Sequence, residues 1–187
     1  MRLREPVDLR RISQALGKGS CPICAFLRNE QSALLKGGLP PGEVTDLCNF
    51  HAWALAAAVD SRNAAEVLLN VLRQTAHHGE HSCSFCTRLQ EHEIIQLKDL
   101  ATQMSRGLIT DWMRQQGTLC RSHGEHLRQL APVKLHGIID EVIGRTNATV
   151  KRGLEHLLGS DLRGDRAGSG VLGHAAEFLA SQRGIHP

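Results

Sequence analysis

The sequence predicts an all-α protein, and three observations support that fold class. Hydrophobic residues make up 41% of the 187 positions, but aromatic residues make up only 3% and tyrosine is absent. The core must therefore be built from Leu, Ile, Val and Ala, which favours helices over a β-sandwich or barrel. Apolar residues also recur at helical spacing along almost the whole chain, and no segment has a convincing strand pattern.

Three helices are predicted in the first half of the chain. Their apolar stripes run from Ile23 to Leu34, from Val44 to Val59, and from about Asn63 to Leu72. The KGG at 36–38 ends the first helix, and the PPG at 40–42 forms a turn before the second. Glu66, three residues after Asn63, completes a variant of the capping box. The polar sequence AHHGEHSC then interrupts the pattern.

The second half of the chain predicts a further series of helices. Their stripes run from Ile94 to Met104, from Leu108 to Gln116, from Leu119 to Leu130, and from Pro132 to Leu154. Pro132 suits the first turn of the long last helix. The sequence GSDLRGDRAGSG at 159–170 has no apolar periodicity and predicts a flexible linker, which a small amphipathic segment follows.

All six cysteines lie in four short motifs. CxxC occurs at 21–24 and 83–86, and LCxxH occurs at 47–51 and 119–123. The order CxxC, LCxxH, helix thus occurs twice, with 23 residues between the second Cys of CxxC and the Cys of LCxxH in the first copy and 33 in the second. A random chain of this composition would hold only about 0.2 CxxC pairs and about 0.35 CxxH pairs. The repetition therefore indicates a shared chemical role.

That role is predicted to be metal binding, with one Cys3His set in each repeat. A CxxC at a turn into a helix can direct both sulfurs at one point, and Cys and His at i and i+3 project from the same helix face. Three thiolates and an imidazole form a closed tetrahedral set that suits Zn²⁺, so two zinc ions per chain are expected. The predicted ligands are Cys21, Cys24, Cys48 and His51 in the first repeat, and Cys83, Cys86, Cys120 and His123 in the second.

The pairing of the motifs has an alternative. Crossed pairing would join Cys21 and Cys24 to Cys120 and His123, and would leave the other four ligands together. Loop closure does not decide between the two, because lengthening a loop from 23 to 95 residues costs only about 1.3 kcal/mol. The repeat order favours pairing within each copy, since each copy then holds a complete site and can fold as a unit.

Other chemistries for the cysteines are weaker. Cys3His sets also hold iron–sulfur clusters, although the two-plus-two arrangement at helix ends is more typical of zinc sites. CPIC at 21–24 is similar to the CPxC of glutaredoxins, but the βαβ context of that fold is missing. A catalytic zinc would need an open coordination position; Glu125 and His126 are candidates for its acid or base, yet HGEH is more typical of a solvated helix face.

Two further features are expected to be structural. Four of the six aromatic residues lie within two positions of a ligand, and we expect them to exclude water from the sites: Phe26, Phe50, Trp53 and Phe85. His77, His78 and His81 are expected to form a polar turn between helices rather than a third metal site.

Charge and segment composition limit the location and the partners of the protein. The net charge of +3 is too small to favour nucleic acid. The N-terminus is charged and lacks the apolar region of a signal peptide, and no run of 18 apolar residues predicts a membrane span. A cytoplasmic location is therefore expected, where cysteine clusters more often bind metal than form disulfides.

The motifs also resemble those of an uncharacterised bacterial family built from tandem CPxC…LCxxH units. The resemblance covers roughly residues 20–130, and the second copy has CSFC where the family pattern has Pro after the first Cys, with both ligands intact. No activity follows from this family.

The sequence thus predicts two pseudo-repeated helical modules, each closed on a Cys3His metal site. Its parts are an N-terminal helix over 1–19, a first module over 20–78, a second over 79–158, and a linker with a short terminal helix over 159–187. Closed structural sites predict a non-enzymatic adaptor, assembly or regulatory protein that acts through protein partners, for example as a subunit or accessory factor of a larger complex. The alternative is a redox or sensing protein with two iron–sulfur clusters.

Overall fold

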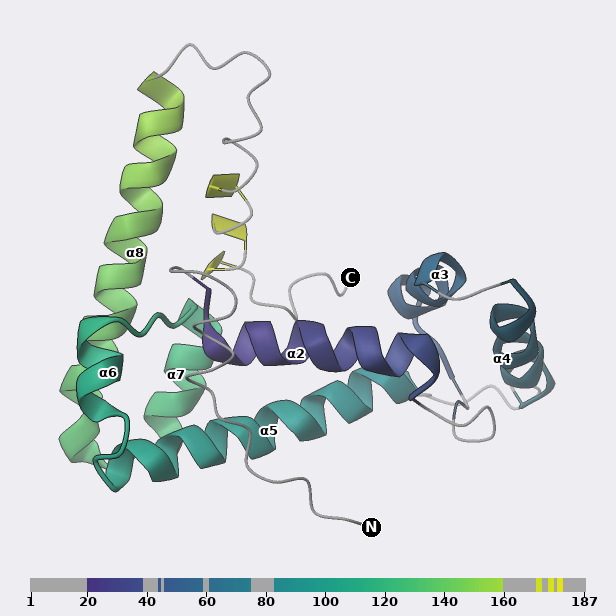
Figure 1. Ribbon diagram of the computed structural model, residues 1–187, viewed down its shortest axis with the longest axis horizontal. Coiled ribbons are helices and arrows are strands. Elements are labelled where there is room, and N and C mark those ends of the chain that lie inside the picture. The colour runs from purple at the N-terminus through teal and green to yellow at the C-terminus, as the bar shows by residue number, and fades with distance from the viewer. Residues whose placement is uncertain are drawn as a thin grey trace. The chain divides into compact units, whose positions relative to one another are not determined.

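A computed structural model describes residues 20–38, 44, 46–58, 61–74, 83–159, 171–172, 175–176 and 178–179 (Figure 1). The residues predicted to form an N-terminal helix over 1–19, the segment 160–170 and the histidines at 77, 78 and 81 lie outside these ranges. The described part of the chain is helical and contains no strand, which confirms the all-α prediction.

The helices follow the predicted stripes closely. In chain order they are α2 (Pro22–Ala33), the π-helical η1 (Leu34–Gly38), α3 (Asn49–Ala58), α4 (Ser61–Gln74), α5 (Ser84–Ser105), α6 (Thr110–Gln115), α7 (Arg121–Leu130), the 3-10 helix η3 (Val133–Leu135) and α8 (His136–Gly159). The largest difference is at α5, which begins at Ser84 although its apolar stripe begins at Ile94, and α3 begins at Asn49 although its stripe begins at Val44. Gly107, with φ of 76°, follows α5 in the left-handed conformation that ends a helix without strain.

The described chain forms two compact units that are interleaved in sequence. Unit 1 comprises residues 20–26 and 95–179, and unit 2 comprises residues 27–94. The boundary passes through α2, after Phe26, and through α5, after Ile94. Each of these two helices therefore contributes to both units.

Unit 1 is built around α8, against which α6 and α7 pack. Leu127, Ile139 and Val142 are fully buried in its core. Gly124 allows α7 to approach α8 closely, because a Cβ at this position would lie only 2.5 Å from Cδ1 of Ile143. The small residue is therefore needed for the packing of these two helices.

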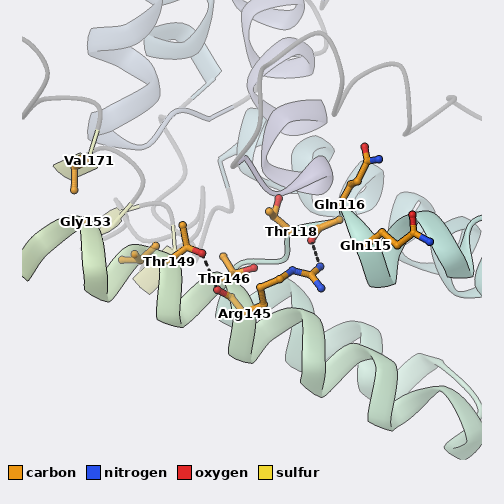
Figure 2. Close-up of a pocket in the computed structure, with 10 residues that line it drawn as sticks. Gln115, Gln116, Thr118, Arg145, Thr146, Thr149, Gly153 and Val171 are labelled. Atoms are coloured by element: carbon orange, nitrogen blue, oxygen red, sulfur yellow. Dashed lines mark hydrogen bonds between the residues drawn. The ribbon is translucent and has the colours of Figure 1, made fainter.

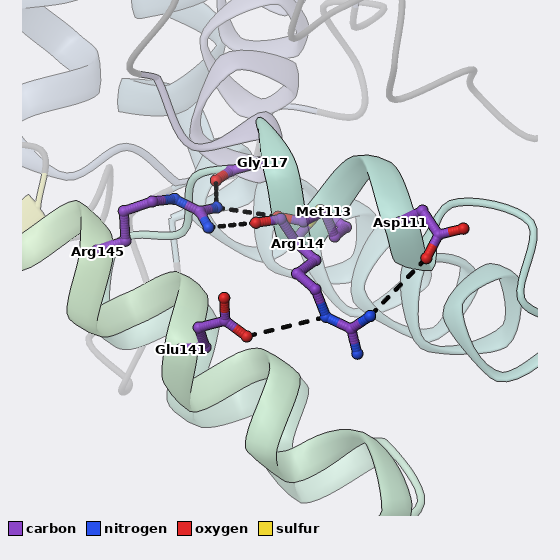
Figure 3. Close-up of polar contacts among 6 residues, drawn as sticks. All are labelled: Asp111, Met113, Arg114, Gly117, Glu141 and Arg145. Carbon is purple, nitrogen blue, oxygen red and sulfur yellow. Dashed lines mark hydrogen bonds and ion pairs between the residues drawn. The ribbon is translucent and has the colours of Figure 1, made fainter.

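Arg145 on α8 holds the end of α6 and the loop that leads to Cys120 (Figure 3). Its guanidinium donates to the carbonyl oxygens of Met113 at 3.0 Å and Gly117 at 2.6 Å, and to that of Arg114. These carbonyls lie at the C-terminal end of α6, where the helix dipole favours a cation. The contact fixes the loop between α6 and α7.

A cavity of about 520 Å³ lies beside the same loop, between α8 and the segment at Val171 (Figure 2). The polar side chains that line it include Thr118, Arg145 and Thr146, and each makes hydrogen bonds within unit 1. Arg145 holds the loop in front of α7 through Gly117, and the hydroxyl of Thr146 accepts from the N–H of Leu119 in the same loop at 3.4 Å. We therefore interpret this part of the cavity wall as structural.

Unit 2 has a smaller core, in which α3 packs against α4 and η1. Its central cluster of buried residues consists of Leu34, Leu35, Val44, Leu55, Val71, Cys83 and Phe85. Leu34 and Leu35 immediately follow α2, and Cys83 and Phe85 lie in the CxxC motif at 83–86. The end of α2 thus leads directly into the surroundings of the second CxxC.

Candidate metal centres

The four motifs adopt one local structure. In each, the first Cys immediately precedes a helix and the second ligand is the third residue of that helix: Cys21 and Cys24 at α2, Cys48 and His51 at α3, Cys83 and Cys86 at α5, and Cys120 and His123 at α7. In each, the carbonyl of the first Cys accepts the backbone N–H four residues later, at 2.9 to 3.0 Å. A spacing of three residues at a helix start therefore brings both ligands of every motif to the same end of its helix.

The helix N-terminus also suits the chemistry of a thiolate. The first N–H groups of a helix have no partner within the helix, and the dipole makes this end positive. At α7, the Cys120 side chain takes up one of these groups by accepting from the backbone N–H of His123, with an N–Sγ distance of 3.5 Å. This environment favours a thiolate, although neighbouring thiols can oppose it.

Site 1 is formed by Cys21 and Cys24 from α2 with Cys120 and His123 from α7, all in unit 1. The Nδ1 of His123 lies 3.5, 3.3 and 3.0 Å from the sulfurs of Cys21, Cys24 and Cys120. The sulfurs of Cys24 and Cys120 are 3.7 Å apart. Four donor atoms therefore surround one point.

Site 2 is formed by Cys48 and His51 from α3 with Cys83 and Cys86 from α5, all in unit 2. The Nδ1 of His51 lies 3.3, 3.5 and 3.4 Å from the sulfurs of Cys48, Cys83 and Cys86. The sulfurs of Cys48 and Cys86 are 3.8 Å apart. In each site, all four donor atoms lie within 4.8 Å of one another.

The predicted ligand types and their two Cys3His sets are thus brought together, but the predicted pairing within each repeat is wrong. Cys21 and Cys24 meet Cys120 and His123, while Cys48 and His51 meet Cys83 and Cys86. The inner two motifs of the chain form one site and the outer two form the other. The division into modules at 20–78 and 79–158 stays a prediction, but neither segment contains a complete ligand set.

Helix length explains the crossed pairing. Loop-closure entropy treats the chain between two motifs as flexible, whereas each CxxC is followed by a rigid helix. The 12 residues of α2 carry the chain about 18 Å from its start, and the 22 residues of α5 about 33 Å. The chain has therefore moved away from each CxxC by the length of one helix before it reaches the LCxxH that follows. In unit 2, Leu34 and Leu35 at the end of α2 pack in the cluster that contains Cys83.

The thiols of site 1 compete for a single negative charge. Burial opposes ionisation of Cys21, but hydrogen bonds with Cys120 and Cys24 and the nearby His123 lower the pKa of its thiol well below the ordinary value. Hydrogen bonds with Cys120 and Cys21, together with burial, raise the pKa of Cys24, and the hydrogen bond with Cys21 raises that of Cys120. The protein groups favour one thiolate, and a cation would stabilise all three.

One thiol of site 2 shows the same effect. Burial, and then the charge of Cys83, raise the pKa of Cys86 above its ordinary value. Adding a second negative charge to this cluster is therefore unfavourable unless a positive charge lies among the sulfurs. Both sites have the electrostatics of cation ligands.

The two sites differ in burial. All four ligands of site 1 are buried, with 0% to 2% of each residue exposed. In site 2, His51 and Cys83 are buried, but Cys48 and Cys86 are partly exposed. Only site 2 therefore has ligand residues that are partly exposed to solvent.

Aromatic residues cover one side of site 2. The ring of Phe85 stacks on His51 with centroids 5.4 Å apart, and Phe50 contacts the same imidazole edge to face at 5.1 Å. Phe26, which is expected to shield the ligands of the first CxxC, is buried in unit 1. The predicted role of Trp53 as a shield is wrong, because 73% of this residue is exposed. On α3, residue 53 lies two positions after His51, which turns its side chain to another face of the helix.

Polar residues two positions before the Cys of each LCxxH hold the segments that enter the sites, and the sequence interpretation missed them. Thr118 donates to the carbonyl of Ser20 at 2.6 Å, and the carbonyl of Asp46 accepts from the N–H of Ser84 at 3.0 Å. Both contacts join the two chain segments of one site. Only the Thr118 contact uses the side chain, so a polar residue before LC could have indicated that contact but not the one made by the backbone of Asp46.

The candidates for catalysis at zinc do not join either site. Glu125 is exposed and forms an ion pair with Arg121 at 3.2 Å, and His126 belongs to neither ligand group. Both groups already provide four protein donors. This arrangement is typical of a structural site rather than a catalytic one.

No family model, curated protein or solved structure matches the chain. The resemblance to tandem CPxC…LCxxH proteins therefore stays a prediction. No helix in the described ranges is long and apolar enough to cross a membrane.

Proposed function

We propose that the chain binds two Zn²⁺ ions, one in each Cys3His site, and acts as a non-enzymatic adaptor, assembly or regulatory protein through protein partners. In this proposal both ions are structural. Each joins the N-termini of two helices that are distant in sequence, and so supplies cohesion that the small leucine-rich cores cannot supply alone.

The observation that supports zinc most strongly is the set of distances between donor atoms. A tetrahedral ion with bonds of about 2.3 Å to sulfur and about 2.0 Å to nitrogen holds two sulfurs about 3.8 Å apart, and sulfur and nitrogen about 3.5 Å apart. One sulfur pair in each site has this separation, with 3.7 Å between Cys24 and Cys120 and 3.8 Å between Cys48 and Cys86. Five of the six sulfur–nitrogen distances are 3.3 to 3.5 Å, and the sixth, between Cys120 and His123, is 3.0 Å.

The same distances favour a single ion over an iron–sulfur cluster. A cluster distributes its protein ligands over two or more irons, so donor atoms on different irons lie further apart than donors on one ion. Here every donor atom of a site lies within 4.8 Å of every other. The alternative of two iron–sulfur clusters is therefore disfavoured on geometric grounds.

Charge also supports a closed divalent site. Three thiolates, a neutral imidazole and Zn²⁺ have a net charge of about −1. Two helix N-termini face each site, and each is equivalent to roughly half a positive charge. The two helix ends thus offset the excess charge of a bound Zn(Cys3His) centre.

Protein partners are supported by apolar side chains on the surface of unit 2. Trp53 on α3 is 73% exposed and Leu72 on α4 is 72% exposed. Tryptophan is enriched at the centres of protein interfaces, because its large rigid ring contributes much apolar area. Both side chains lie on helices that site 2 and its core hold in place.

Metal analysis of the full chain tests the first part of this proposal. Protein purified anaerobically under reducing conditions should be colourless and contain two zinc ions per chain by elemental mass spectrometry. Brown protein that contains iron and acid-labile sulfide would contradict it and support the cluster alternative.

A surface variant tests the second part. Trp53→Asp should abolish a complex that is isolated from the native host and then reconstituted from purified proteins, while both zinc ions remain bound. Val133→Asp, at a position 79% exposed in unit 1, serves as the matched control and should leave the complex intact. If both variants bind the partner equally well, Trp53 does not belong to the interface.

A further inference from the structure

The two sites provide an internal comparison between sulfur pairs of equal separation and unequal access. Cys24 and Cys120 in site 1 have sulfurs 3.7 Å apart, and Cys48 and Cys86 in site 2 have sulfurs 3.8 Å apart. Cys24 is 0% and Cys120 2% exposed, whereas the pair in site 2 is partly exposed. The separation of the two sulfurs is therefore nearly the same in both sites, whereas the burial of the two residues differs.

Cys48 and Cys86 are the two partly exposed ligand residues of site 2, and both also pack against the apolar cluster of unit 2. His51 and Cys83, at 1% and 6% exposure, lie on the buried side. Phe85 stacks against the imidazole there, and Cys83 and Phe85 both belong to the apolar cluster of unit 2. Of the four ligands, Cys48 at the start of α3 and Cys86 on α5 are therefore the most exposed to a small reactant.

We propose that site 2 is an oxidation site, at which a peroxide joins Cys48 and Cys86 in a disulfide and releases the zinc ion, while site 1 keeps its zinc. This inference rests on the proposed binding of zinc to both sites. It assigns them different roles: site 1 is a permanent structural centre, and site 2 responds to oxidants.

The reaction balances with hydrogen peroxide as the two-electron oxidant. One exposed thiolate attacks a peroxide oxygen, which breaks the O–O bond and forms a sulfenic acid and hydroxide. The second thiolate then attacks that sulfur and expels hydroxide, which forms the S–S bond. Each sulfur loses one electron, peroxide gains two, and two protons from solvent convert the hydroxides to water.

Loss of two ligands should free the ion and loosen unit 2. Only Cys83, a member of the apolar cluster, and His51, which stacks on Phe85, would remain. Two donors hold zinc far less tightly than four. Because the ion joins α3 to α5, its release removes the link between these helices, and unit 2 retains only its small core.

Oxidation of the zinc-loaded full chain tests the inference. The protein is treated with hydrogen peroxide in slight excess, zinc release is followed with a chromogenic chelator, and disulfides are mapped by mass spectrometry. We expect about one zinc ion per chain to leave in a fast phase, together with a Cys48–Cys86 disulfide. The second ion should leave at least about ten-fold more slowly, and a thiol reductant with zinc should restore the starting state.

Matched variants assign the fast phase. Cys48→His keeps a donor atom at site 2 but cannot form the disulfide, so the fast phase should disappear. Cys120→His makes the equivalent change at site 1 and should leave the fast phase intact. Release of both ions in one phase, or a Cys24–Cys120 disulfide that forms first, would overturn the inference alone. Fewer than two zinc ions before oxidation would contradict the proposed function and this inference with it.

Discussion

At the scale of single residues, the ligands could be predicted from sequence because their geometry is local. A Cys immediately before a helix and a Cys or His at its third residue face the same point whatever the rest of the fold does. The exposure of Cys48 and of Trp53 could not be predicted in this way. It depends on which neighbouring helices cover each side of α3, and a spacing of three residues says nothing about them.

The pKa shifts of site 1 predict that metal binding releases protons. The pKa values of Cys24 and Cys120 are raised, so both thiols keep their protons at neutral pH, whereas that of Cys21 is lowered and its thiol ionises more readily. Zinc must displace the protons of Cys24 and Cys120, so at least about two protons should leave per ion bound at site 1. The apparent affinity should therefore fall as the pH falls.

Calorimetric titration of site 1 in buffers of different ionisation enthalpy measures this number. The double variant Cys48→Ser with Cys86→Ser removes the competing site. An apparent affinity of site 1 that does not change with pH would show that its thiols are already ionised before the metal binds.

At the scale of elements, the sequence predicts the positions of the helices more accurately than the contacts between them. Periodicity placed the first helix up to Leu34 and a long last helix through Leu154, because each apolar stripe is a property of one helix. The predicted pairing of the motifs is wrong, because the position of each motif depends on the length and direction of the helix that precedes it. The close approach of α7 to α8 at Gly124 is also a property of two helices together.

Substitution of Gly124 should destabilise unit 1. A Cβ at this position would lie 2.5 Å from Cδ1 and 2.6 Å from Cγ1 of Ile143, so Gly124→Ala should lower the free energy of unfolding by about 1–3 kcal/mol. Gly144→Ala, in the middle of α8 with no atom within 4 Å of the new Cβ, should instead raise it by roughly 0.5–1 kcal/mol. Urea unfolding of the zinc-loaded variants measures both effects. Equal effects of the two substitutions would mean that α7 does not pack closely on α8.

At the scale of the whole molecule, the crossed pairing predicts how combined ligand losses behave. Cys24→Ser with Cys120→Ser removes two ligands from site 1 only, so the chain should retain about one tightly bound zinc ion. Cys24→Ser with Cys48→Ser removes one ligand from each site, so neither ion should stay tightly bound. The opposite pattern in elemental analysis would restore the pairing within repeats.

Metal removal should unfold much of the chain. Structural zinc supplies an apparent binding free energy of about 10–16 kcal/mol per site in small domains, and most domains are stable by only about 5–15 kcal/mol in total. A strong chelator under reducing conditions should therefore reduce the helical signal in far-ultraviolet circular dichroism. Unchanged helix content and melting temperature would show that the cores are sufficient without the ions.

The ligands of site 2 lie between those of site 1 in the sequence, so the two sites are completed at different times during synthesis. Site 2 is complete once Cys86 has left the ribosome, but the sulfurs of Cys21 and Cys24 must wait for Cys120, which lies 34 residues later. At about 5–20 residues per second, this delay is roughly 2–7 s. During that interval the earliest pair of thiols to be made has no imidazole and no third sulfur to share a metal with. We therefore expect the nascent chain to be most sensitive to oxidants and to competing metals at Cys21 and Cys24, the same residues that are the best protected once synthesis is finished.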